Sequence, residues 1–452
     1  MTFDFERFVF MKKFICLFLA CALIFSFCAC GKQEIADSND DNYNAAVSLM
    51  DKGNYEEAIV IFESLDGYKD SLEKINECNA AIIDGKYNNA LALMDAGEYT
   101  EAASIFKTLD GYKESSDNIS IIYNEALLLM NAGEYRKAIS IFGELDDYED
   151  SQLYFSSILK EISVKQTITA GYESTIGLKS DGTIISVCAG GKDEWGTSDL
   201  SDIVALSTGS YHTVALKADG SVIATEYTRG DYVPYCGQCD TEDWTDIVSI
   251  SACSNRTVGL KSNGTVVAVG GNDYGECDVL DWTDIIAIST GENHTVALKS
   301  DGTVVAIGRN DFGQCNVDDW TDIVSVSAGR DHTVGLKSDG TVVVTEVLID
   351  YYYDEHQYDV SEWTNIVAIS SKNKVIVGLK SDGTVIRVNG WESTNLSNVS
   401  GWTDIVAIAA GDTHIVGLKS DGSVVVGVDK TYSMNKASEW TDIKIPNNNY
   451  LQ

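Results

Sequence analysis

Residues 291–315 read GENHTVALKSDGTVVAIGRNDFGQC, and this stretch decides the fold of most of the chain. It contains two short β-branched runs joined by Ser-Asp-Gly. Asp-Gly between two such runs predicts a β-hairpin, because both turn positions tolerate a positive φ. The centre of the stretch recurs, and its glycine falls at seven positions: Gly182, Gly220, Gly264, Gly302, Gly340, Gly383 and Gly422.

A second marker trails each hairpin. It is Leu200-Ser201-Asp202-Ile203 in the first copy, and Trp-Thr-Asp-Ile or a close variant from Trp244, Trp282, Trp320, Trp363, Trp402 and Trp440. Repeats of about 40 residues, with no room for a crossover helix, predict a propeller of seven radially packed blades. The last marker lies beyond the seventh hairpin, so we predict that it pairs into the first blade and closes the ring.

The motifs at residues 291–298, 329–336, 308–314 and 271–276 resemble the regulator of chromosome condensation repeat family. The resemblance extends over about 280 residues and implies a seven-bladed propeller. The best-known function of that family is nucleotide exchange on a chromatin-bound nuclear GTPase. We do not transfer it, because an exported, acidic chain meets neither chromatin nor that GTPase, and a fold does not confer a function.

A different repeat precedes the hairpins. Gly-x-Tyr-x-x-Ala stands nine residues before a Phe in three copies, at Gly53 and Phe62, Gly97 and Phe106, and Gly133 and Phe142. Apolar residues at helical spacing flank each glycine and predict a helix, a glycine turn and a second helix. The pattern resembles the tetratricopeptide repeat, without its terminal proline and with spacings of 44 and 36 residues. We expect an irregular solenoid with extra linking helix, which serves either to bind peptides or as a spacer.

The N-terminus has the features of an export signal. Lys12 and Lys13 precede an apolar run over residues 14–27 that is too short to span a bilayer comfortably. The run ends at Cys28-Ala29-Cys30 and resembles a bacterial lipoprotein signal, which implies lipidation of Cys30; the first ten residues look like an upstream mis-start. An ordinary cleaved signal or a membrane stub is the alternative. Residues 31–42 are polar and predict a solvated tether.

Composition excludes some partners. Lys plus Arg is 32 against 69 for Asp plus Glu, and the net charge of -37 repels nucleic acid and anionic membrane surfaces. We therefore expect membrane association only through the lipid. The chain is predicted to be an α plus all-β multidomain protein: signal peptide 1–30, acidic tether 31–42, tetratricopeptide-like repeats 43–161 and seven-bladed propeller 162–452.

The sequence predicts no catalytic, cofactor or metal site. Four of the five histidines, His212, His294, His332 and His414, share one repeat position, and Ser174, Arg256 and Val375 take it in other blades. A residue that recurs once per blade lies at separate points around the ring, so these histidines are predicted to be hydrogen-bonded packing residues. Cys236 and Cys239 have metal-ligand spacing, but Cys239, Cys277 and Cys315 also share a repeat position, which favours packing.

Two insertions break the propeller repeat. Hairpin glycine and following Trp are 24 residues apart from Gly220 and 23 from Gly340, against 18 or 19 elsewhere. Tyrosine dominates many binding hot spots, and both insertions are rich in it. The candidate partner-binding residues are Tyr227, Arg229, Tyr232, Tyr235, Tyr351, Tyr352, Tyr353, His356 and Tyr358. The alternatives are drift in tolerant loops, or calcium held by Asp350, Asp354 and Glu355.

Together these features favour a non-catalytic lipoprotein on the outer face of a bacterial cell membrane. Its propeller and helical repeats are expected to mediate protein-protein or protein-ligand binding, with a protein partner at the cell envelope. One alternative is an enzyme that acts on glycans through carboxylates in the propeller mouth. The other is a purely structural spacer. The oligomeric state and the organism are left open.

Overall fold

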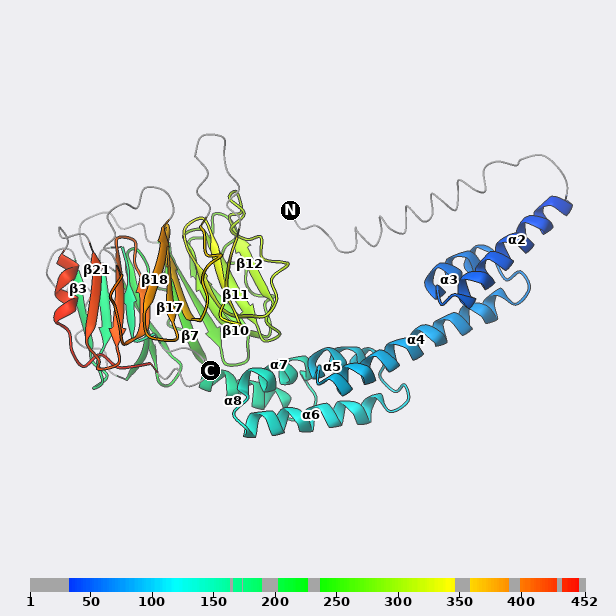
Figure 1. The fold of residues 1–452 in the computed structure, drawn as a ribbon, viewed down its shortest axis with the longest axis horizontal. Helices are drawn as coiled ribbons and strands as arrows, with labels where there is room; N and C mark the ends of the chain where they lie inside the picture. Colours follow the sequence, from blue (N-terminus) through cyan, green and yellow to red (C-terminus); the bar gives the residue numbers. More distant parts are fainter. Residues whose placement is uncertain are drawn as a thin grey trace. The chain divides into compact units, whose positions relative to one another are not determined.

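The computed structural model describes residues 32–162, 166–172, 174–188, 202–226, 236–345, 358–389, 399–428 and 433–446. The chain forms two compact units, residues 1–116 and 117–452. Within the described residues, helices come first and seven three-stranded sheets follow (Figure 1). None of the described helices is long and apolar enough to cross a bilayer.

Each predicted helical copy is a helix, a glycine turn and a second helix. The helices are α2 (Lys32–Asp51), α3 (Tyr55–Ser64), α4 (Ser71–Ala96), α5 (Tyr99–Thr108), α6 (Ser115–Asn131), α7 (Tyr135–Leu145) and α8 (Ser151–Ile162). The three turn glycines have φ between 82° and 85°, which favours glycine. Phe62, Phe106 and Phe142 are fully buried, and each meets a tyrosine edge-on at 5.7–5.9 Å.

Two helical predictions need correction. Helix α2 begins at Lys32, so the segment predicted as a tether is helical; no proline or glycine interrupts it, and Asp40 on this helix forms an ion pair with Lys69. The 44-residue spacing from Gly53 to Gly97 does not contain a separate linking helix. It lengthens α4, which has 26 residues against 17 in α6.

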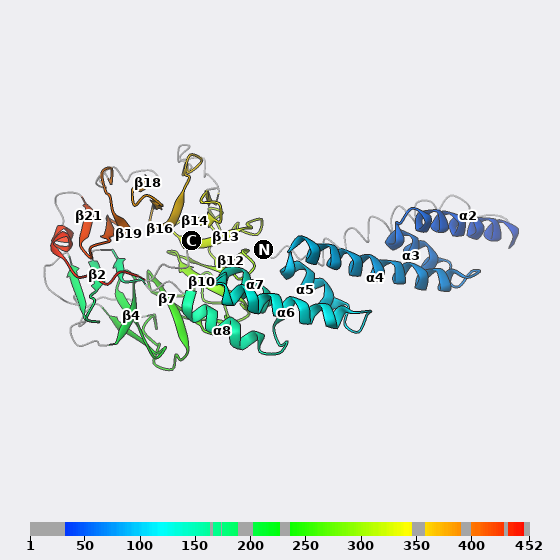
Figure 2. The same cartoon turned by 60° about the horizontal axis from the view of Figure 1, so that its bottom comes forward.

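The seven predicted hairpin units are confirmed as seven antiparallel sheets. Their strands are β1 (Ile168–Ala170), β2 (Ser174–Leu178), β3 (Ile184–Cys188), β4 (Ile203–Thr208), β5 (His212–Lys217), β6 (Val222–Glu226), β7 (Ile247–Cys253), β8 (Arg256–Lys261), β9 (Val266–Gly270), β10 (Ile285–Thr290), β11 (His294–Lys299), β12 (Val304–Gly308), β13 (Ile323–Ala328), β14 (Thr333–Lys337), β15 (Val342–Val344), β16 (Ile366–Lys372), β17 (Val375–Lys380), β18 (Val385–Asn389), β19 (Ile405–Ala410), β20 (His414–Lys419) and β21 (Val424–Val428). The first strand of each blade contacts the first strands of both neighbours, and β1 contacts β4 and β19, so the ring is closed (Figure 2).

The hairpin turn differs from the predicted form. Only the glycine has a positive φ, 83° at Gly302, while the aspartate acts through its side chain. Asp301 Oδ1 accepts hydrogen bonds from the backbone N–H and the hydroxyl of Thr303 at 2.8 and 2.6 Å. The aspartate of the turn is therefore selected for this side-chain contact rather than for backbone freedom.

The Trp-Thr-Asp-Ile segments join neighbouring blades. At six such joints the isoleucine N–H donates to the glycine carbonyl of the preceding turn at 3.0–3.1 Å. The aspartate of the segment adopts a positive φ, and its carbonyl accepts an N–H from the turn of its own blade, as Asp284 does from Ser300. In five blades the tryptophan covers a middle-strand glycine, where an added Cβ would lie within 3.1 Å of the ring.

Ring closure by the C-terminal segment is confirmed, although through a single bridge rather than a strand. Residues 433–439 form the 3-10 helix η2 (Ser433–Glu439), and Ile443 then bridges to Lys179 of the first blade. Ile443 N–H donates to Gly422 of the seventh blade at 3.1 Å, and Trp440 covers Gly177 of the first. Helix η2 contacts both β3 of the first blade and β21 of the seventh.

The helices end at Ile162 and the strands begin at Ile168, but most of the third helical copy lies in the same compact unit as the propeller. Arg136 on α7 donates to the Val324 carbonyl of β13 at 3.1 Å. Phe155 on α8 packs so closely on Gly264 that a Cβ there would lie 2.9 Å from its ring. These side chains fasten α7 and α8 to the propeller.

Candidate functional site

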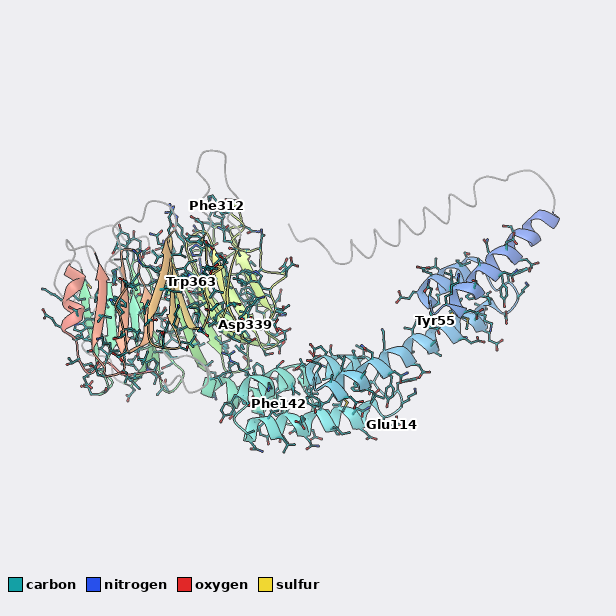
Figure 3. The ribbon with its side chains drawn as sticks, in the orientation of Figure 1. Tyr55, Glu114, Phe142, Phe312, Asp339 and Trp363 are labelled. Atoms are coloured by element: carbon teal, nitrogen blue, oxygen red, sulfur yellow. The ribbon has the colours of Figure 1, made fainter. Side chains whose placement is uncertain are left out.

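The propeller has two dissimilar faces. The turn face carries the seven hairpin turns and the Trp joints, and α7 and α8 contact it. The loop face carries the loops between first and middle strands, such as residues 291–293, and those that follow third strands, such as residues 309–315. Figure 3 shows Phe312 and Asp339 at these opposite ends of the blades.

The four repeat histidines are confirmed as packing residues. Each is fully buried, and its Nε2 forms a hydrogen bond of 2.7–3.0 Å with a hydroxyl of the next blade; the partners are Thr257 for His212, Thr333 for His294, Ser371 for His332 and Thr175 for His414. Burial lowers the pKa of His294 and His332 to about 3 and that of His212 and His414 to about 4. The imidazoles are therefore neutral structural groups at neutral pH.

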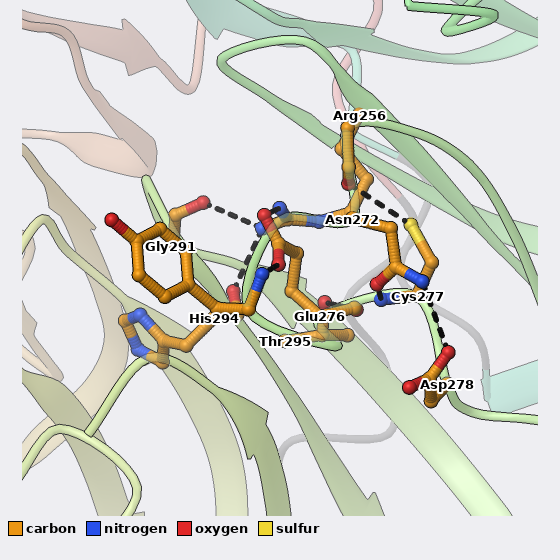
Figure 4. A network of polar contacts seen from close by, with 10 residues as sticks. Arg256, Asn272, Glu276, Cys277, Asp278, Gly291, His294 and Thr295 are labelled. Carbon is orange, nitrogen blue, oxygen red and sulfur yellow. Dashed lines mark hydrogen bonds and ion pairs between the residues drawn. The ribbon is translucent and has the colours of Figure 1, made fainter.

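The third blade replaces the histidine with Arg256, which lies in a buried polar network (Figure 4). Its Nη1 lies 3.3 Å from Glu276 Oε1, and its Nη2 donates to the carbonyls of Gly291 and His294 at 2.9 Å. Glu276 Oε2 accepts the N–H of Tyr274 at 2.7 Å, a bond that Gln314 reproduces with Phe312 at 3.0 Å. Blade 3 thus has a paired arginine and glutamate at the two positions where its neighbouring blades have histidine and glutamine.

This pairing predicts that blade 3 can be converted to the sequence of its neighbours. Arg256→His alone or Glu276→Gln alone leaves one charge buried without its partner, so each should lower the free energy of unfolding by about 3 kcal/mol. The double variant reproduces His294 and Gln314 and should recover most of the loss. Denaturant unfolding of the three variants measures this, and additive losses in the double variant would contradict the pairing.

Aromatic and arginine side chains gather on the loop face, where Tyr274 and Arg330 are exposed and Arg309 and Phe312 are partly buried. Arg309 lies over the rings of Tyr274 and Phe312, with its guanidinium carbon 5.4 and 5.3 Å from their centres. Tyr274 is 50% exposed, and Arg330 on the next blade is bound by Glu292 and Asp331. We call Tyr274, Arg309, Phe312 and Arg330 the loop-face patch. Sequence reasoning used residues 271–276 and 308–314 only as repeat motifs and missed this patch, although Tyr274 and Phe312 share one repeat position.

Most of the sequence-predicted binding residues lie outside the described residues: Cys30, Tyr227, Arg229, Tyr232, Tyr235, Tyr351, Tyr352, Tyr353 and His356, together with Asp350, Asp354 and Glu355. The first insertion follows Glu226, which pairs with His212 at the loop-face end of its blade. Tyr358 is described and is only 8% exposed, with its ring 4.2 Å from that of His332. It belongs to the blade core, so its inclusion among surface binding residues is a correction.

The repeat cysteines also lie in packing positions. The thiols of Cys277 and Cys315 donate to the carbonyls of Gly271 and Arg309 at 3.3 Å. Burial raises their pKa to about 11 and 12, so both stay protonated at neutral pH. Among the described residues no cluster of three or more His, Cys, Asp or Glu side chains could hold a metal ion.

Lys372 breaks the repeat at the loop-face end of the ring. Glycine fills its place in most blades, where a Cβ at Gly209, Gly291 or Gly329 would lie 2.2–2.3 Å from the following histidine. Blade 6 has Val375 instead of that histidine, which leaves room for a side chain. Lys372 Nζ donates to the Thr208 carbonyl of blade 2 at 3.3 Å, so the lysine reaches between blades that are far apart in sequence.

The closed ring of seven three-stranded sheets defines a seven-bladed β-propeller preceded by helical repeats. A family model for the regulator of chromosome condensation (RCC1) repeat matches residues 285–314 and 323–345, in the fourth and fifth blades. The chain therefore carries repeats of this type. No curated protein sequence matches it.

Solved propellers share low sequence identity with this chain. The CRINKLY ectodomain of the Arabidopsis thaliana receptor kinase ACR4 is 16% identical, with a TM-score of 0.49 over 63% of this chain and 99% of that one. The CR4 ectodomain of Physcomitrella patens is 16% identical, with a TM-score of 0.44 over 59% and 74% of the two chains. Prp20p of Saccharomyces cerevisiae is 16% identical, with a TM-score of 0.42 over 64% and 88%.

Proposed function

We propose that this protein is a non-catalytic, surface-anchored binding protein whose loop face docks a protein partner at the cell envelope. The observation that carries the proposal is the partly exposed loop-face patch, in which Arg309 lies over the rings of Tyr274 and Phe312. Aromatic and arginine side chains of this kind dominate the binding energy of protein interfaces. The turn face is occupied in part by α7 and α8, which favours the opposite face for docking.

Several titratable groups of the ring are engaged in packing contacts and ion pairs, while the buried Oδ2 of Asp412 has no hydrogen-bond partner among the described residues. The four described histidines and the Arg256–Glu276 pair are buried and engaged with neighbouring blades. Glu292 and Asp331 on the loop face both form ion pairs with Arg330, at 3.1 and 3.5 Å. These carboxylates therefore act as parts of an ion-pair network.

Shortening both insertions tests the docking face. Removing residues from 227–235 and 346–357 until both repeats have the common length should leave the melting temperature nearly unchanged, because other blades close with the shorter loops. Capture of a defined envelope partner should fall at least tenfold. Lys337→Ala on the turn face is the matched control and should capture normally. Undiminished capture by the shortened chain would move the site elsewhere.

Anchoring is tested separately at Cys30. We propose that this cysteine carries the lipid, so Cys30→Ser should release the protein from the membrane fraction into the medium. Cys28→Ser is the control and should stay membrane-bound. Retention of the Cys30→Ser protein in membranes would contradict the anchor and leave the docking proposal intact.

A further inference from the structure

The centre of the propeller holds a cavity of about 210 Å³. Its wall is formed by the first strands of the blades, with Ile250, Ile288, Val326 and Ile369 among the lining residues. Six serines among the described residues also line it, so the wall is polar as well as apolar: Ser249, Ser251, Ser289, Ser325, Ser327 and Ser370. Arg136 of α7 also lines this cavity, together with Ile162 at the end of α8. The cavity is therefore enclosed jointly by the ring and by the third helical copy.

Arg136 is the one charged side chain among the described residues that line the cavity. Its Nη2 donates to the Val324 carbonyl at 3.1 Å, while no described carboxylate forms an ion pair with it. Burial lowers the pKa of this guanidinium, which shows that the surroundings disfavour its charge. Burying a cation without a counter-charge lowers the stability of the fold, unless a bound anion accepts its hydrogen bonds and balances its charge.

The repeat register shows that packing does not demand an arginine here. The equivalent positions of the first two helical copies hold Glu56 and Thr100. The cation occurs only in the copy that lies against the propeller channel. Because the chain carries a net charge of -37, one uncompensated arginine facing a cavity is a local exception.

We propose that this cavity binds a small organic monocarboxylate with an apolar body. The planar guanidinium would take the carboxylate through two parallel hydrogen bonds, and the isoleucine and valine wall would cover the apolar part. A cavity of about 150 Å³ accepts benzene, so one of about 210 Å³ has room for a ligand on the scale of benzoate, whose carboxylate suits the polar part of the wall. Part of the Arg136 side chain remains exposed, which offers a route to the guanidinium.

The competing explanation is that Arg136 only fastens α7 to β13. The variant Arg136→Gln distinguishes fastening from anion binding. Its amide can still donate to the Val324 carbonyl but carries no charge. If Arg136 only fastens α7 to β13, the substitution should not change the binding of any ligand. Anion binding predicts that the uncharged variant keeps its melting temperature and loses the ligand.

The test is calorimetric titration of the mature chain with benzoate, with benzamide as the uncharged analogue and with inorganic phosphate. We expect benzoate to bind, benzamide and phosphate to bind at least tenfold more weakly, and Arg136→Gln to weaken benzoate at least tenfold. Lys137→Gln, on the same helix and exposed, is the control and should bind normally. If Arg136→Gln fails to fold, Arg136→Lys serves, with an expected intermediate loss. Absence of benzoate binding, equal binding of benzamide, or unchanged binding by the variants would overturn the proposal.

Discussion

Deletion of residues 440–452 should lower the free energy of unfolding of the propeller by at least about 5 kcal/mol. The deletion removes Trp440, a buried aromatic that covers Gly177, and Ile443, which bonds Gly422 and bridges Lys179. The first and seventh blades then lose the joint that the other neighbouring blades keep. Loss of one joint also exposes the apolar cluster that contains Val416 and Leu418.

Deletion of residues 447–452 alone is the matched control for ring closure, since it leaves the joint in place. Its midpoint of urea unfolding should match that of the intact chain. Equal stability of the two deletion variants would show that the C-terminal joint does not hold the ring.

Acidification from pH 7 to pH 5 should destabilise the propeller by roughly 8 kcal/mol. The four buried histidines have a folded pKa of about 3 or 4, below the unfolded value of 6.5. Between pH 6.5 and pH 4 these histidines therefore bind protons in the unfolded chain but not in the folded chain. The stability is complete above pH 6.5 and is lost as the pH falls toward 4, with roughly 2 kcal/mol for each histidine at pH 5.

Urea unfolding at a series of pH values measures this loss. Burial raises the pKa of Asp331 and Asp412, so these two carboxyl groups stabilise the folded chain as the pH falls. They are two groups against the four histidines. Replacing His332 with Gln should reduce the slope of stability against pH by about a quarter. Equal stability at pH 7 and pH 5 would mean that these rings do not stay neutral on acidification.

The repeat pattern predicted the fold because a propeller is built from one local rule applied seven times. Glycine and aspartate spacing gave the number of blades, and the surplus Trp440 segment predicted closure. The same logic identified the histidines as packing residues, since a group that recurs around a ring cannot assemble one site.

What the sequence did not predict depends on contacts between elements that are distant in the chain. The docking of Phe155 on Gly264 and the reach of Lys372 to Thr208 involve separations that no repeat period encodes. Helix α2 extends over a polar segment, and Asp40 within it forms an ion pair with Lys69, a contact that the local sequence does not encode. The buried position of Tyr358 against His332 likewise follows from where its insertion rejoins the blade.

The most direct test of the binding role is site-specific photocrosslinking on intact cells. A photoreactive phenylalanine replaces Tyr274 on the loop face in one variant and Asp339 on the turn face in the other. We predict a discrete crosslinked protein partner from position 274, competed by the soluble intact chain, and none from position 339. Crosslinking from position 339 alone, or from neither position, would contradict the assignment of the loop face as the docking surface.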